Sequence, residues 1–115
     1  MLTTWRSLDI LPQDHQLYVG RPGSVGQRGA NFAQQNADLI ICIGARLDLA
    51  QVAYNYGDFA RGAKKVIVDI DEHELTKPSI SVDLPLCMDA KVFIEQLLMC
   101  FVGCNQTCKL CRLVL

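Results

Sequence analysis

The sequence predicts an α/β fold, a doubly wound parallel sheet flanked by helices. Residues 39–43 are five consecutive apolar residues, and such a run without alternation is typical of a parallel strand buried on both faces. Residues 66–71 form a second expected buried strand, rich in β-branched side chains and with acids at its carboxyl end. Stretches with helical spacing or turn residues separate these runs, so strands and helices alternate along the chain.

The composition fits one domain of modest size. The chain has 115 residues, of which 50% are hydrophobic, enough to build a core. Its net charge of −1 favours neither a nucleic acid nor a membrane surface as a partner. We find no secretory signal and no apolar stretch of the ~18 residues that a membrane-spanning helix needs. We therefore expect a cytoplasmic protein with no nucleic-acid or membrane partner.

The other elements are expected from periodicity and from turn residues. We expect the apolar stripe of Ala30, Phe32, Ala33 and Ala37 to pack a helix on the sheet, and Asp89 to be the N-cap of the last helix. The remaining expected elements are a β-favouring piece at 2–5, a short helix at 7–11, strands at 17–19 and 80–84, a short helix near 58–63 and a final helix through Cys100.

A polar segment follows the first central strand, where open parallel sheets bind their ligands. Gly44, Ala45, Arg46 and Asp48 offer close backbone approach, a cation and a carboxylate. Asp69 lies 25 residues after Gly44 and ends the second central strand. An acidic residue in this position can bind the hydroxyls of a nucleotide ribose, although the acids here can equally well start the next turn.

A glycine-rich segment at residues 20–29 precedes the first expected long helix. It contains four glycines, and each follows the previous one in the spacing G-x-x-G. Glycines here allow backbone amides to converge on a phosphate at the start of a helix, and they are equally suited to a plain turn. Because this is not the spacing of the dinucleotide-binding motif, both interpretations remain open.

The six cysteines are unevenly distributed. Cys42 and Cys87 are expected to act as small buried hydrophobic residues. Cys104, Cys108 and Cys111 have the spacing C-x-x-x-C-x-x-C, which resembles the [4Fe–4S] loop of radical SAM enzymes. An iron–sulfur cluster, a zinc site and an out-of-frame or truncated C-terminus are the alternatives for this tail.

Seven short motifs together resemble the central domain of thiamine diphosphate-dependent enzymes of the acetolactate synthase type. In sequence order they are Thr3-Thr4-Trp5, Gly20-Arg21-Pro22-Gly23, Gly29-Ala30-Asn31-Phe32-Ala33, Ala37-Asp38-Leu39, Gly44-Ala45-Arg46-Leu47-Asp48, Val68-Asp69-Ile70-Asp71 and Asp89-Ala90-Lys91. The resemblance covers residues 1–100, a partial central domain, and leaves 101–115 as an atypical cysteine-rich tail.

The resemblance implies a Rossmann-like sheet of six parallel strands, of the DHS-like NAD/FAD-binding type, between a pyrimidine-binding and a diphosphate-binding domain. In the family these neighbouring domains hold thiamine diphosphate and Mg²⁺, and the parent enzymes are homo-oligomers. The central domain holds FAD, ADP or nothing. By position, the cofactor-binding residues would be Thr4, Trp5, Gly20, Arg21, Pro22, Gly23, Gly44, Ala45, Arg46, Asp48, Asp69, Ile70, Asp89 and Ala90.

We therefore expect a truncated central domain with a structural role and with possible FAD or ADP binding. The parent would be a transferase acting on 2-oxo acids, while this chain would contain no catalytic residue. The alternatives are a free-standing adenine-nucleotide module and a small iron–sulfur or zinc protein that uses the tail.

Overall fold

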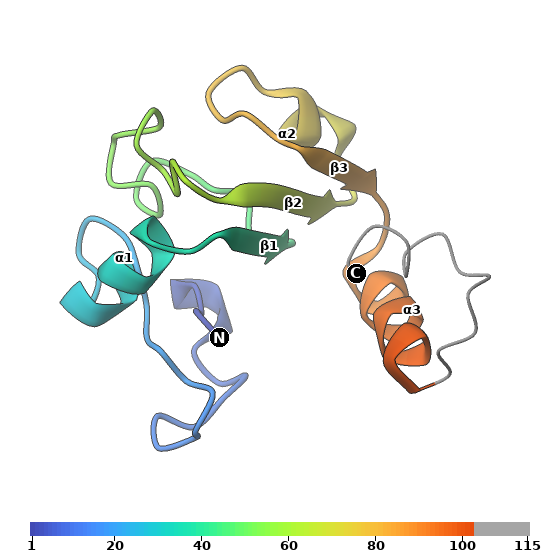
Figure 1. Cartoon of the computed structure of the whole chain (residues 1–115), viewed down its shortest axis with the longest axis horizontal. Helices are drawn as coiled ribbons and strands as arrows, with labels where there is room; N and C mark the ends of the chain where they lie inside the picture. Colours follow the sequence, from blue (N-terminus) through green and yellow to red (C-terminus); the bar gives the residue numbers. More distant parts are fainter. Residues whose placement is uncertain (103–115) are drawn as a thin grey trace.

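A computed structural model describes residues 1–102 as a parallel sheet with helices around it (Figure 1). The strands are β1 (Leu39–Ile43), β2 (Lys64–Asp69) and β3 (Leu84–Cys87), in the order β1-β2-β3. The helices are α1 (Arg28–Gln35), α2 (Glu72–Thr76), α3 (Ala90–Val102) and the 3-10 helix η1 (Trp5–Ser7). The predicted α/β class is confirmed. Within the described part the sheet has three strands.

The central strand β2 is buried on both faces, as its sequence predicts. Ile67 and Val68 point to opposite faces and are 5% and 0% exposed. The same expectation is wrong for β1, where Cys42 is the one buried residue and Leu39 is 49% exposed. The reason is that β1 pairs with one neighbour only in the described sheet.

The largest core cluster lies between the sheet, α2 and the long loop at residues 45–63. Leu47, Val52 and Phe59 of this loop pack with Ile67 of β2 and Leu75 of α2. The loop consists of turns, so the short helix expected near 58–63 is wrong. Several of its apolar side chains are nevertheless buried, so this irregular segment contributes to the core.

Helix α3 begins where the sequence predicts. Asp89 Oδ1 accepts hydrogen bonds from the backbone N–H groups of Lys91 at 2.8 Å and Val92 at 3.2 Å, which is N-cap geometry. The helix contacts β2, and its Phe93 is 2% exposed. Phe93 therefore anchors α3 to the rest of the domain.

Helix α1 forms, but its predicted apolar stripe is only partly correct. Ala30 is fully buried, together with Gln34 one turn later, whereas Phe32 is 70% exposed. Two residues along a helix correspond to a rotation of about 200°, so Phe32 lies on the side opposite Ala30. In Figure 1, α1 and the N-terminal segment lie on the β1 side of the sheet, and α2 lies on the β3 side.

Three further elements differ from expectation. The strand expected at 17–19 is replaced by a single parallel bridge between Leu2 and Gly20, and the helix expected at 7–11 by η1. The strand expected at 80–84 begins at its last residue and continues through Pro85, because the pairing with β2 starts at Leu84. Proline is tolerated there because β3 is an edge strand of the described sheet.

Helix α2 was not expected. Asp71 Oδ1 accepts a hydrogen bond from the backbone N–H of His73 at 2.9 Å and so caps its start. Among the described residues, none of the helices is long and apolar enough to cross a membrane.

We predict that Phe93→Ala lowers the free energy of unfolding of the full chain by about 3–5 kcal/mol, because it leaves a cavity in a fully buried site. The matched control is Phe32→Ala, whose 70% exposed side chain should change stability by less than about 0.5 kcal/mol. Denaturant unfolding measures both values. Equal losses in the two variants would show that α3 is not anchored through Phe93.

Candidate functional site

The carboxyl ends of the three parallel strands form one edge of the sheet, called here the rim. The chain leaves the strands at Gly44, Asp69 and Cys87. The backbone N–H of Gly44 donates to the carbonyl of Val68 at 2.8 Å, and that of Met88 donates to the carbonyl of Asp69 at 3.0 Å. Each bond joins the segment that follows an outer strand to the end of the central strand β2, so the predicted binding segments are neighbours.

The segment after β1 has an unusual backbone conformation. Gly44, Arg46 and Leu47 have φ angles of 56°, 48° and 52°, in the left-handed region. For a residue with a side chain this conformation costs about 1–2 kcal/mol, so surrounding contacts must hold Arg46 and Leu47 in it. Leu47 is 4% exposed and packs in the core, while the Arg46 side chain is 77% exposed at the rim.

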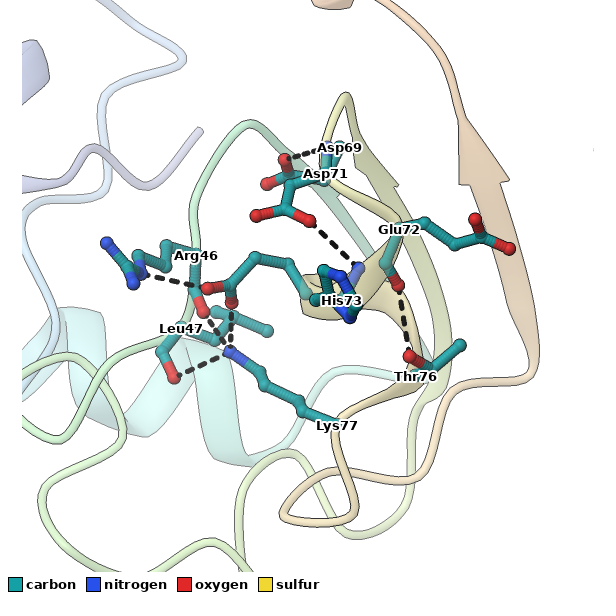
Figure 2. A network of polar contacts seen from close by, with 9 residues as sticks. Arg46, Leu47, Asp69, Asp71, Glu72, His73, Thr76 and Lys77 are labelled. Atoms are coloured by element: carbon teal, nitrogen blue, oxygen red, sulfur yellow. Dashed lines mark hydrogen bonds and ion pairs between the residues drawn. The ribbon is translucent and has the colours of Figure 1, made fainter.

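Two residues of the α2 region bind this segment (Figure 2). Arg46 Nε lies 2.9 Å from Glu74 Oε1, and Lys77 Nζ lies 2.8 Å from Glu74 Oε2, so one carboxylate bridges two cations. Lys77 Nζ also donates to the backbone carbonyl of Arg46 and lies 3.5 Å from that of Leu47. The backbone of the left-handed turn is therefore contacted by a side chain that comes about thirty residues later.

Glu74 is the ionised centre of this network. Its hydrogen bond from Lys77 holds the pKa of the Glu74 carboxyl below its ordinary value of 4.5, and the charges of Lys77 and Arg46 act in the same direction. Partial burial of the side chain opposes the shift. The carboxyl is thus charged at neutral pH and pairs with both cations.

An open hollow of about 540 Å³ lies beside this network. Aromatic and aliphatic side chains line it together with two cations and two carboxylates, a mixture typical of small-molecule sites. Its lining residues are Arg46, Leu47, Asp48, Leu49, Ala50, Tyr54, Tyr56, Glu74 and Lys77. The charges of these four side chains sum to zero, so Arg46 is the group with which an anion would interact, rather than an overall positive charge of the hollow.

The glycine-rich loop lies next to the loop that forms the hollow. Gly23 has φ 130°, and a Cβ there would lie 2.6 Å from the carbonyl oxygen of Ala50, so this position requires glycine. The N–H of Ser24 donates to the same oxygen at 2.9 Å. The Asn31 side chain binds both backbone groups of Gly23, accepting at 2.8 Å and donating at 3.0 Å.

The N-terminal members of the predicted site form a separate group. The Arg21 guanidinium lies 5.5 Å from the ring centroid of Trp5, a cation–π contact. The hydroxyl of Thr4 is bonded to Ser7 within η1. The N–H of Thr3 donates to the carbonyl of Gly20 at 3.1 Å, and this bond joins the group to the glycine-rich loop. Pro22 of that loop is fully buried. None of these residues lines the hollow.

The predicted acidic residues make local bonds to the backbone. One carboxylate oxygen of Asp48 accepts from the N–H of Gln51 at 3.0 Å, and one of Asp69 accepts from that of Asp71 at 3.0 Å. Asp89 caps α3 directly before Ala90. These acids therefore shape their own turns, as the alternative interpretation of the sequence allowed. Ile70 is 74% exposed beside them.

Glu74 and Lys77 are the charged residues of this site that the sequence analysis missed, and the apolar and aromatic lining residues were not predicted either. Their signal is the Glu-x-x-Lys spacing after Asp71, an acidic N-cap followed by an i, i+3 pair on one helical turn. Residues three apart lie side by side only in a helical turn, so this spacing is informative only if a helix is expected at 72–76.

The cysteines offer no second site in the described part of the chain. Cys42 is buried, and this burial raises the pKa of its thiol to about 11, so it is an inert core residue as predicted. Cys87 is exposed, which corrects the expectation that it is buried. Residues 1–102 contain no group of three or more metal-ligating side chains. Cys104, Cys108 and Cys111 lie outside the described residues.

Comparison with known proteins agrees with this architecture. The family described as "Thiamine pyrophosphate enzyme, central domain" matches residues 1–97. This chain belongs to that family. The acetolactate synthase large subunit of Corynebacterium glutamicum is 37% identical over 98 residues, which make up 85% of this chain and 15% of that protein.

Two further relatives of this central domain have similar names. The acetolactate synthase large subunit of Lactococcus lactis is 36% identical over 98 residues, covering 85% of this chain and 17% of the relative. A probable acetolactate synthase large subunit of Methanocaldococcus jannaschii is 34% identical over 101 residues, covering 88% and 17%. The resemblance to acetolactate synthases is confirmed, and the chain spans 15 to 17% of these relatives.

We predict that Glu74→Gln destabilises the chain by roughly 1 kcal/mol at about pH 7, and that this difference disappears in acid. Because the folded pKa lies below 4.5, the ion pairs contribute fully above that value and are lost as the pH falls through the folded pKa. Unfolding curves across this pH range measure the effect. Glu95→Gln, at a 56% exposed position on α3, is the control and should change little.

Proposed function

We propose that this chain is the nucleotide-binding central domain of a thiamine diphosphate-dependent 2-oxo acid enzyme of the acetolactate synthase type. Its ligand would be FAD or ADP, bound at the rim of the sheet. The observation that carries the proposal is the exposed Arg46, held over a hollow lined by Tyr54 and Tyr56 at the end of a parallel strand.

The residues present fit an adenine nucleotide. The salt bridge of Arg46 uses Nε, and the 77% exposed side chain leaves both terminal amino groups accessible to a diphosphate. The two tyrosines provide aromatic surface of the kind that a base or flavin ring needs. Asp69, at the end of the neighbouring strand, provides a carboxylate for ribose hydroxyls.

The rest of the proposal rests on the family resemblance. Thiamine diphosphate and Mg²⁺ would bind the pyrimidine- and diphosphate-binding domains of the parent enzyme, and these domains are the proposed partners of this one. When bound there, thiamine diphosphate supplies the carbanion chemistry of the family. A homo-oligomeric parent and a cytoplasmic location belong to the same proposal.

We predict that the full chain binds ADP saturably and that Arg46→Ala weakens binding by about ten- to a hundredfold. Charge-assisted hydrogen bonds to a diphosphate are worth roughly 1.5–3 kcal/mol each, and this variant removes them. Asp69→Asn keeps the shape and one acceptor oxygen, so its effect should be smaller. Isothermal titration calorimetry with ADP and with FAD measures all three proteins.

Substitution of the tail cysteines is the control for this prediction. Changing Cys104, Cys108 and Cys111 to serine should leave ADP affinity unchanged. If a folded sample binds neither ADP nor FAD, or if the cysteine changes abolish binding while Arg46→Ala does not, the proposed site is wrong. The second result would direct attention to the tail.

We also predict that the 115-residue chain by itself forms no acetolactate from pyruvate, even with thiamine diphosphate and Mg²⁺. The reason is that its sequence contains no Gly-Asp-Gly motif of the kind that anchors the cofactor's metal in the family. A colorimetric assay for acetolactate on the purified chain measures this. Turnover above the level of a heat-treated control would overturn the prediction.

A further inference from the structure

The turn at Arg46 and Leu47 raises the question of what holds it. Both residues are left-handed without being glycine, with φ angles of 48° and 52°, so the chain itself does not favour the turn. Arg46 is the candidate nucleotide-binding cation. Its direction depends on this backbone conformation, so whatever fixes the turn also fixes the site.

The contacts of Lys77 answer this question. Its ammonium group has three N–H donors, and Glu74 Oε2 at 2.8 Å, the Arg46 carbonyl and the Leu47 carbonyl at 3.5 Å surround it. The Lys77 side chain is 23% exposed, against 77% for that of Arg46. Lys77 thus binds the backbone of the turn, while Arg46 faces solvent.

From these contacts we propose that Lys77 is the positioning residue of the rim. It fixes the left-handed turn through the carbonyls of Arg46 and Leu47, and so presents the Arg46 guanidinium to a phosphate. Glu74 links the two cations, because one of its carboxylate oxygens binds Arg46 and the other binds Lys77. The role of Arg46 rests on the proposed nucleotide site, whereas the effect of Lys77 on the turn does not.

The first test is therefore independent of any ligand. Lys77→Met keeps most of the length of the side chain and removes the ammonium group. Cleavage by an arginine-specific protease between Arg46 and Leu47, followed by mass spectrometry, reports how often the turn opens. We expect Lys77→Met to increase the rate of this cleavage about tenfold.

Matched controls separate a local effect from a general one. Cleavage after Arg61, in the same loop but away from Lys77, should keep its rate, and Lys91→Met on α3 should change neither rate. Lys77→Arg should restore protection, and its new arginine precedes Pro78, so the bond after it resists the protease. An unchanged rate at Arg46 in Lys77→Met, or an equal rise at both sites, overturns the proposal.

The second test links the turn to binding. In calorimetry with ADP, Lys77→Met should weaken affinity about tenfold in the natural sequence and less than about twofold when Arg46 is already alanine. If Lys77→Met weakens ADP binding equally whether residue 46 is arginine or alanine, Lys77 contacts the nucleotide itself, and the positioning role is wrong. If the natural chain binds no ADP, the proposed function fails, and the protease rates alone decide whether Lys77 holds the turn.

Discussion

The backbone of β2 is paired with a parallel strand on each side, and this pairing determines where the candidate binding residues lie. Because all three strands run in the same direction, the segments after Ile43, Asp69 and Cys87 emerge at one edge. A parallel sheet also needs cover, and both α2 and α3 contact β2. The burial of Ile67 and Val68 therefore stabilises the sheet, and the rim exists only while the sheet is folded.

The sequence predicted the parts of this fold that depend on local chemistry. The apolar run at 39–43 became a strand, and so did the β-branched run expected at 66–71, although its strand spans 64–69. Asp89 capped a helix. These signals need no knowledge of distant contacts. Phe32 was misassigned because an apolar residue inside a helix does not reveal which side of the helix faces the sheet. Only the position of Ala30 against its neighbours decides that.

The candidate site also combines features that local sequence predicts with features that depend on distant contacts. Arg46 was predicted from its position after a strand, whereas its partners were not. Glu74 belongs to a five-residue helix with little periodicity of its own, and Lys77 directly follows that helix. The left-handed turn could not be read from the sequence either, because neither Arg46 nor Leu47 is a residue that favours it. Long-range bonds to Lys77 impose this conformation, and single-sequence patterns contain no record of such bonds.

The two hydrogen bonds between Asn31 and Gly23 connect helix α1 with the glycine-rich loop. One amide side chain satisfies both polar groups of the Gly23 backbone, as a neighbouring strand would, and so joins the glycine-rich loop to α1. This loop touches the Ala50 carbonyl through Gly23 and Ser24. Two successive contacts, Asn31 with Gly23 and Ser24 with Ala50, therefore connect α1 to the loop that lines the hollow.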